Sequence, residues 1–177
     1  MTEPNKTLEL PSYIAGEAAG EELLDVIYPY TGEVTGRVRQ VDGAGLEHAL
    51  AATKPVELSR WARHEILTKA RALLSERAEE FAQLIRSESG LCMRETRYEV
   101  GRTQDVLQFA AMEALRDDGQ VFSCDVSPQG KARKIFTLRE PLQLAAAITP
   151  FNHPLNQVAH KLSPAIAAGT PMILKPS

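Results

Sequence analysis

Cysteine is scarce in this sequence: its 177 residues contain only two, Cys92 and Cys124. One pair cannot build the disulfide framework of a small secreted domain, and no Cys-x-x-Cys pair is available to hold structural zinc. We therefore expect no metal site, no stabilising disulfides and a reducing compartment, the cytoplasm.

Long apolar runs and blocks of like charge are absent as well. No segment approaches the roughly 20 apolar residues of a membrane-spanning helix, and the N-terminal MTEPNKTLEL lacks the apolar core of a secretory signal. Lys and Arg number 20 and Asp and Glu 23, so the net charge is −3. Because a nucleic-acid-binding surface is basic, we expect neither a nucleic-acid nor a membrane partner. What remains, 44% apolar and 24% charged residues, is typical of a globular domain with a sizeable core.

The N-terminal quarter of the chain predicts short strands and a first helix. Residues 12–17 form a short extended piece that ends at a turn. Residues 23–41 carry two apolar runs around Tyr30-Thr31-Gly32, which predicts a strand, a turn and a second strand. Asp42 is the expected N-cap of the helix that follows.

Two longer helices are predicted next. The clearest begins at a cap on Ser59 and ends at Gly90, and another spans about residues 94–116 and stops before Gly119. Apolar residues recur along both at intervals of three, four and seven, so we expect them to face the core. They are Ile66, Ala70, Leu73, Leu74, Phe81, Leu84 and Ile85 in the first helix and Val100, Leu107, Ala111 and Leu115 in the second.

In the last third of the chain, the spacing of apolar residues changes from a helical pattern to one typical of strands. We expect a hairpin arm around residues 135–139 and a buried strand over 144–149, followed by a helix over about 156–168 and a second buried strand over 171–175. A strand, a helix and a strand in this order form a βαβ unit, which implies a parallel sheet. The predicted fold class is therefore α/β.

Chemically useful side chains follow both strands of this unit. Asn152 comes just after the first strand and Lys175 ends the second. In α/β proteins, ligands bind at the carboxyl ends of parallel strands. A carboxamide there can donate a hydrogen bond to an oxygen that gains negative charge, and an ammonium can reach ribose hydroxyls or a phosphate. The alternative is that Asn152 only caps the following helix and that Lys175 is a solvated strand end.

The residues of this region carry a resemblance to a known family. The stretch ITPFNHP, then Lys161, then PAIAAGTPMILKPS is similar to the aldehyde dehydrogenase superfamily, and YPYTGEVTGRV, ESG and REPL agree with it upstream. The resemblance implies the N-terminal part of that fold, with helices packed on an incomplete parallel sheet plus a β-hairpin arm. It also implies NAD- or NADP-dependent oxidation of an aldehyde to a carboxylic acid through a cysteine thioester.

The resemblance assigns roles to matching positions. Asn152 matches the amide that stabilises the tetrahedral oxyanion, and Lys161 matches a lysine that assists proton movement. Lys175 matches the lysine that contacts the adenosine ribose. Further positions match the lining of the cofactor site, and these are Ile148, Thr149, Pro150 and Phe151, with Asn152 beside them as a second cofactor contact.

A narrower likeness concerns the substrate. The stretches SGLCMRETRYEVGR, ALRDDGQVFSCDVSPQGK and ITPFNHPLNQVAHK are similar to phosphonoacetaldehyde dehydrogenases. This implies that Arg102 and His153 bind a phosphonate, for which Arg offers bidentate contact. The alternatives are a surface or helix-pairing role for Arg102 and a loop histidine bonded to backbone. Other small aldehydes, such as glyceraldehyde 3-phosphate or lactaldehyde, remain alternative substrates.

Several parts of the family's site have no match in residues 1–177. The nucleophilic cysteine and the general-base glutamate of the family follow the KPS strand. The resemblance therefore implies an N-terminal fragment of the NAD(P)-binding domain, inactive alone, with the catalytic domain absent.

Residues 120–143 are then expected to contribute a β arm to the oligomerisation region of a homodimer or homotetramer. Cys92 precedes a helix, where a thiolate is favoured, but both cysteines lie in segments that match scaffold. A different class of function also stays open, namely a non-catalytic interaction module that pairs through the arm.

Overall fold

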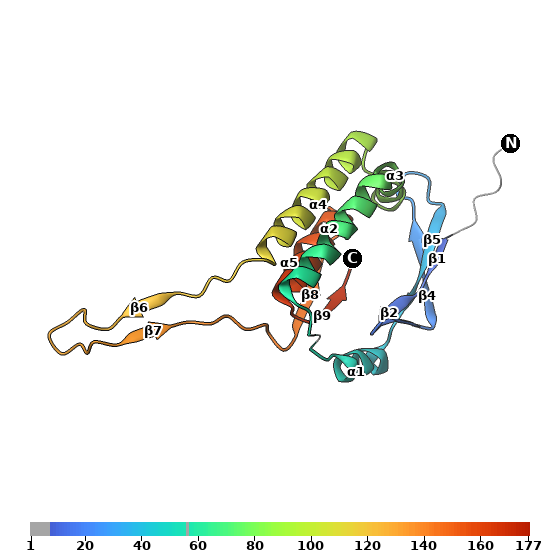
Figure 1. Ribbon diagram of the computed structural model, residues 1–177. Helices are drawn as coiled ribbons and strands as arrows, with labels where there is room; N and C mark the ends of the chain where they lie inside the picture. The colour runs from blue at the N-terminus through green and yellow to red at the C-terminus, as the bar shows by residue number, and fades with distance from the viewer. Residues whose placement is uncertain (1–7, 56) are drawn as a thin grey trace.

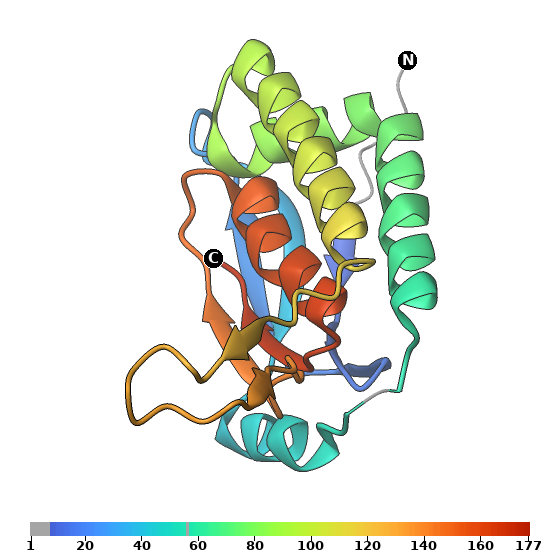
Figure 2. The ribbon, with the colours of Figure 1, turned by 60° about the vertical axis from the view of Figure 1, so that its left-hand side comes forward.

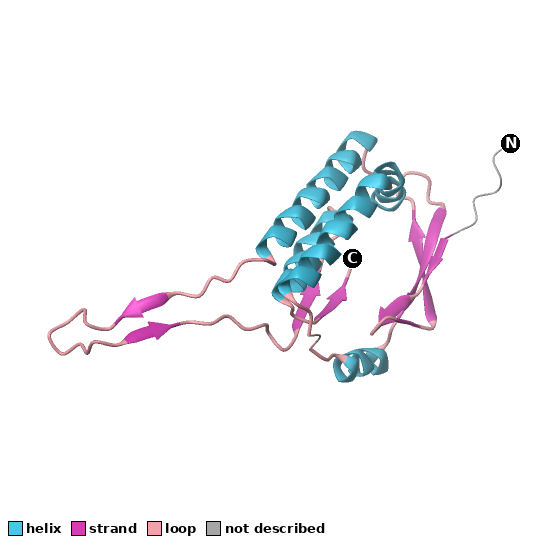
Figure 3. Cartoon of the chain, viewed as in Figure 1, coloured by secondary structure: helices cyan, strands magenta, loops and turns pink. Residues whose placement is uncertain are grey.

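The computed structural model describes residues 8–55 and 57–177 (Figure 1). The fold is α/β, as predicted. Within the described ranges the chain forms nine short strands and five helices, and the strands pair in four small sheets. Four of the helices gather in the middle of the molecule, with strands on either side of them (Figure 3). No helix in these ranges is long and apolar enough to cross a membrane.

The N-terminal strands form two sheets. Strands β4 (Glu22–Ile27) and β5 (Val34–Gln40) are antiparallel, which confirms the predicted strand, turn and strand. Strand β1 (Leu8–Leu10) joins β5 in parallel, a pairing that the sequence did not predict. The short extended piece becomes a hairpin of β2 (Ser12–Ile14) and β3 (Glu17–Ala19).

Two predicted helix caps are confirmed. Helix α1 (Gly43–Ala52) begins after Asp42, whose Oδ1 accepts a hydrogen bond from the Gly45 amide at 2.8 Å. Helix α2 (Arg60–Glu76) begins after Ser59, whose hydroxyl accepts from the Ala62 amide at 3.1 Å. Both bonds satisfy an amide that has no partner within its own helix.

The prediction of one helix from Ser59 to Gly90 is wrong. Helix α2 ends at Glu76, and a separate helix, α3 (Ala78–Ser89), follows after Arg77, which leaves helical geometry at φ −107° and ψ 18°. The break brings Leu74 of α2 and Ile85 of α3 into one buried cluster. Tertiary packing sets this break, because Arg is a good helix former and leaves no signal in the sequence.

The core lies between the helices and contains smaller residues than expected. Helix α4 (Met93–Glu113) presents alanines to α2 and to α5 (Pro154–Ala168), which lets the three helices approach closely. The predicted core is partly confirmed, for Val100 and Ala111 are buried. It is wrong for side chains that the structure leaves exposed, and these are Ile66, Leu73, Leu84 and Leu115. The buried residues of α2 are Leu67 and Leu74. Leu74 was predicted, whereas Leu67 lies one position after the predicted Ile66.

A two-stranded arm projects from this body (Figure 1). Strand β6 (Val121–Ser123) pairs antiparallel with β7 (Lys134–Phe136). This confirms the predicted hairpin. Its apolar side chains, including Val121 and Phe136, are exposed to solvent.

The C-terminal βαβ unit is also confirmed. Strand β8 (Ala145–Ile148) pairs in parallel with β9 (Met172–Lys175), and α5 connects them along α4 (Figure 2). Helix α5 begins two residues earlier than predicted and ends, as predicted, at Gly169 in the left-handed conformation. The expectation of a buried first strand is only half right, because Ala147 is buried whereas Ile148 is 77% exposed.

Candidate functional site

The tips of the two parallel strands lie side by side. Ile148 of β8 is the register partner of Lys175 of β9, and the Thr149 amide donates to the Lys175 carbonyl at 3.2 Å. Lys175 is exposed, and its Nζ donates to the Pro176 carbonyl at 3.1 Å. The sheet therefore brings the start of the 149–153 loop and the lysine ammonium to one edge, as expected from the parallel topology.

The loop from β8 to α5 exposes most of its side chains. Pro150, Phe151 and Asn152 are exposed, and Phe151 is 77% accessible. Thr149 is buried instead, and its hydroxyl oxygen has no hydrogen-bond partner among the described residues. The loop thus combines an apolar surface with an accessible carboxamide beside the two strand tips.

Helix α5 is capped by a residue from another helix. Its own N-cap residue, His153, makes no side-chain capping bond. Glu99 of α4 takes that role, because its Oε1 accepts hydrogen bonds from the amides of Leu155 at 2.8 Å and Asn156 at 2.9 Å. The alternative in which Asn152 only caps the helix is therefore wrong, and the carboxamide of Asn152 stays exposed.

Glu99 is the residue that the sequence interpretation missed. It is 1% exposed, and its second oxygen, Oε2, lies 3.5 Å from Nδ1 of His153. A signal was present, since Glu99 sits between Thr96, Val100 and Thr103 on the buried face of α4. A carboxylate on an otherwise uncharged buried face needs compensating partners. Here these are the two amides of α5 on one oxygen and the nearby imidazole of His153 on the other. Burial raises the pKa of the nearby Glu88 carboxyl, and the charge of Glu99 raises it further.

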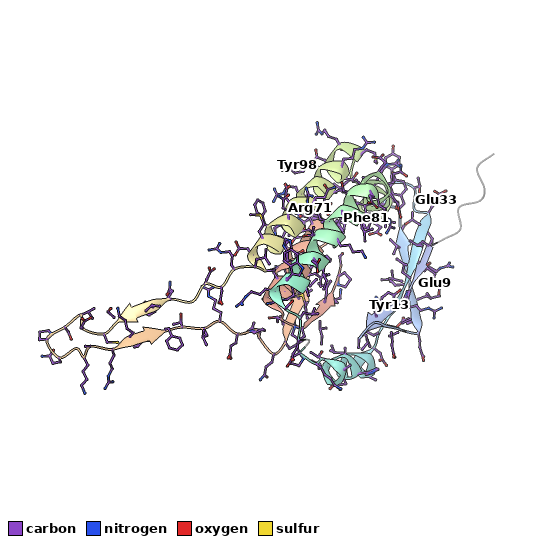
Figure 4. The ribbon with its side chains drawn as sticks, viewed as in Figure 1. Glu9, Tyr13, Glu33, Arg71, Phe81 and Tyr98 are labelled. Atoms are coloured by element: carbon purple, nitrogen blue, oxygen red, sulfur yellow. The ribbon has the colours of Figure 1, made fainter. Side chains whose placement is uncertain are left out.

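Arg102 lies on α4 one turn beyond Glu99 and is exposed. A hydrogen bond with Tyr98 raises the pKa of Arg102, and the charge of Asp105 adds to this effect. Tyr98 lies in the part of α4 farthest from the arm (Figure 4). Glu99 ties this part of α4 to the start of α5, and Arg102 follows Glu99 by three residues on α4.

The other sequence candidates lie away from the strand tips. Lys161 is exposed on α5, about 10 Å along the helix axis from Pro154. Cys92 is the exposed N-cap of α4, and Cys124 belongs to the arm. Within the described ranges, no three His, Cys, Asp or Glu side chains gather as a metal site would require.

Comparison with known proteins decides the family. The pattern described as the aldehyde dehydrogenase family matches residues 14–177. The chain belongs to the aldehyde dehydrogenase family. The resemblance carried by ITPFNHP and ILKPS is thereby confirmed at the level of the family.

Similar aldehyde dehydrogenases come from bacteria and a moss. A 3-sulfolactaldehyde dehydrogenase of Priestia megaterium is 36% identical over 181 residues, which cover 100% of this chain and 38% of that protein. The structure of aldehyde dehydrogenase 21 from Physcomitrella patens, in complex with the reaction product succinate, superposes with a TM-score of 0.89 at 32% identity. The alignment covers 97% of this chain and 37% of the moss chain.

A third similar protein is the NADP-dependent glyceraldehyde-3-phosphate dehydrogenase from Bacillus halodurans, solved in complex with NADP. Its TM-score is 0.88 at 27% identity, over 97% of this chain and 38% of that one. The chain thus spans little more than a third of the length of the aldehyde dehydrogenases that it matches.

Proposed function

We propose that this chain forms the N-terminal part of the NAD(P)-binding domain of an enzyme that oxidises a small anionic aldehyde to a carboxylic acid. The substrate we favour carries a phosphonate, as phosphonoacetaldehyde does, or the related sulfonate. The observation that carries the proposal is the exposed Asn152 carboxamide on a loop whose start adjoins Lys175. In this proposal the nucleophile and the general base come from parts of the fold without a counterpart in residues 1–177.

The chemistry of the strand tips fits a nicotinamide dinucleotide. Such a molecule presents flat ring faces together with hydroxyl and phosphate groups. The exposed side chains of Ile148 and Phe151 offer an apolar wall, and the Lys175 ammonium offers a donor for ribose hydroxyls or phosphate. When bound, NAD or NADP supplies the acceptor for the hydride that leaves the aldehyde carbon.

Asn152 stabilises charge in this scheme. Attack of a thiolate on the aldehyde turns the carbonyl oxygen into an oxyanion, and the carboxamide N–H of Asn152 donates a hydrogen bond to it. The amide is held ready because Glu99 fixes the first turn of α5, directly after the loop. Lys161 lies about two turns further along α5. In this proposal it assists proton movement from a position away from the reacting oxygen.

Arg102 and His153 recognise the anionic group of the substrate in this proposal. Two named relatives support an anion beside the aldehyde, because 3-sulfolactaldehyde carries a sulfonate and glyceraldehyde 3-phosphate a phosphate. A guanidinium can bind two oxygens of such a group at once, and an imidazole N–H can bind a third. Both side chains are accessible, His153 at 42% and Arg102 on the surface of α4.

The test compares pairs of aldehydes that differ only in the anionic group. In the full-length protein, Arg102→Leu should raise KM about 10-fold or more for phosphonoacetaldehyde and leave KM for acetaldehyde within about 2-fold. The same measurement with 3-sulfolactaldehyde and lactaldehyde tests sulfonate recognition, and comparison of the two pairs shows which anionic group Arg102 prefers. Arg94→Leu, which removes an arginine of the same helix that is 87% exposed, is the matched control. A wild-type preference for uncharged aldehydes would refute the anionic substrate.

One observation favours a second candidate substrate. Tyr98 and the charge of Asp105 raise the pKa of Arg102, so its charged form is favoured without any substrate anion. If Arg102 keeps these partners with substrate bound, it is a surface residue and an uncharged aldehyde such as lactaldehyde becomes the better substrate. Equal effects of Arg102→Leu on charged and uncharged aldehydes would support this candidate.

We also propose that the protein is a homo-oligomer joined through the β6–β7 arm. The proposal is supported by the exposed apolar side chains of the arm, which gain from burial against another copy.

A further inference from the structure

The Glu99 carboxylate divides its two oxygens between two tasks. Oε1 accepts both amide bonds from the first turn of α5, at 2.8 and 2.9 Å. These bonds and the positive end of the helix dipole compensate the negative charge of a side chain that solvent does not reach. The orientation of the carboxylate is therefore fixed by the backbone of another helix.

The second oxygen still lacks a full partner. Oε2 is buried and makes no standard hydrogen bond to the described residues. The basic atom within ion-pair distance of it is Nδ1 of His153, at 3.5 Å. An unpaired buried carboxylate oxygen is costly, and a shift of a few tenths of an ångström turns this contact into a hydrogen bond from Nδ1–H.

We propose that Glu99 is a positioning residue, which holds the proton of His153 on Nδ1 and orients the ring so that Nε2 faces the substrate. The part of this proposal that concerns substrate rests on the proposed function, in which His153 binds the anionic group. When both ring nitrogens carry protons, Nδ1–H donates to Glu99 and Nε2–H donates to the phosphonate or sulfonate. The imidazole then stands between two negative groups that would otherwise repel each other.

Glu99→Gln tests this role without removing the cap. The carboxamide oxygen of Gln can still accept from the amides of Leu155 and Asn156, so the start of α5 keeps its hydrogen bonds. The NH₂ group then occupies the place of Oε2 and donates toward Nδ1. A donor at this position forces the proton of a neutral ring onto Nε2, so the tautomer of His153 inverts.

The tautomer can be measured without any substrate. Solid-state ¹⁵N spectra of histidine-labelled full-length protein report the tautomer of each ring, and comparison with His153→Asn assigns the signal of interest. At a pH where the ring is neutral, we expect a protonated Nδ1 in the wild type and an unprotonated Nδ1 in Glu99→Gln. Glu95→Gln, which changes a carboxylate one turn earlier on α4, should match the wild type. The same Nδ1 signal in Glu99→Gln and the wild type would overturn the proposal.

Kinetics test whether Glu99 acts through His153. Glu99→Gln should raise KM for phosphonoacetaldehyde about 5- to 10-fold and change kcat and KM for acetaldehyde by less than about 2-fold. Added to His153→Asn, the same substitution should have no further effect, since its target is gone. An equal rise of KM on both backgrounds would show that Glu99 does not act through His153. If the wild type does not prefer anionic aldehydes, the proposed function fails, while the tautomer measurement still decides the contact.

Discussion

Asn152 lies next to the N-cap of α5 and stays exposed, because a residue of another helix bonds the first-turn amides. An asparagine just before a helix ordinarily accepts a hydrogen bond from a first-turn amide. Here the amides of Leu155 and Asn156 are bonded to Glu99, and Asn152 remains exposed. Its carboxamide is therefore available to a ligand at the strand tips.

Replacement of this residue separates chemistry from folding. In the full-length enzyme, Asn152→Ala should lower kcat by about 10²- to 10³-fold, the typical loss for one oxyanion donor. Its free energy of unfolding should change by less than about 0.5 kcal/mol, because the side chain is exposed and caps nothing. Steady-state kinetics and urea unfolding measure the two quantities. Near-normal turnover would show that Asn152 donates no hydrogen bond to the reacting oxygen.

The sequence located Asn152 and Lys175 but could not locate Glu99. The first two follow from a local rule, since residues after parallel strands meet at one edge, and the register of Ile148 with Lys175 confirms it. The contact of Glu99 joins residues 56 and 57 positions apart in the chain. Such a contact depends on how α4 lies against α5, which no local pattern encodes.

At the scale of elements, α5 is held at both ends by other helices. Glu99 of α4 accepts hydrogen bonds at its N-terminus, and Arg63 of α2 donates from Nη1 to the Ala167 carbonyl at 2.8 Å near its C-terminus. A negative group at the start and a positive group at the end complement the helix dipole. The position of α5 between the two strands is thus set by side chains from α4 and α2.

Gly169 should be sensitive to substitution for this reason. Its φ of +75° is strained for other residues, and an added Cβ would lie 2.7 Å from Nη1 of Arg63. We expect Gly169→Ala to lower the free energy of unfolding by about 1–2 kcal/mol, through strain and a weakened bond to Ala167. Gly101→Ala is the matched control, because that position is helical and has open space around it, and it should stabilise by about 0.5–1 kcal/mol. Urea unfolding of both variants measures the difference, and equal effects would contradict the explanation.

Element boundaries show the limits of periodicity. The apolar repeat correctly identified helical residues before and after Arg77 but not the break at that residue. Leu67 of α2 packs against alanines near the end of α4, and the residues on either side of the break pack in a second cluster with Val100. Cap residues predicted the helix ends more reliably than the apolar repeat did. The reason is that Asp42, Ser59 and Gly169 interact with residues a few positions away in the chain.

At the scale of the whole molecule, the arm is the segment that projects from the body, and it carries exposed apolar side chains (Figure 1). The β6–β7 arm extends away from the helices, and its apolar side chains have no cover among the described residues (Figure 1). This surface is the basis for the proposal that the arm joins the copies of a homo-oligomer.

A charge placed on the arm should weaken that contact. We expect Phe136→Lys to lower the molar mass of the full-length protein in solution at micromolar concentration, because an ammonium is costly to bury in an apolar interface. Gln129→Lys adds the same charge at an exposed polar position of the arm and should leave the mass unchanged. Light scattering coupled to size-exclusion chromatography gives both masses. An unchanged mass for Phe136→Lys would place the interface elsewhere.

The order of residues in the 149–153 loop has a consequence for changing substrate preference. Asn152 and His153 are adjacent, and the turn that follows them is fixed by a single carboxylate. The hydrogen bonds of that carboxylate go to backbone amides and survive a replacement of His153, but the new side chain lies directly beside Asn152, so turnover is expected to fall together with selectivity. Arg102 lies on a separate, rigid helix, so directed evolution toward new aldehydes should find its fastest variants there.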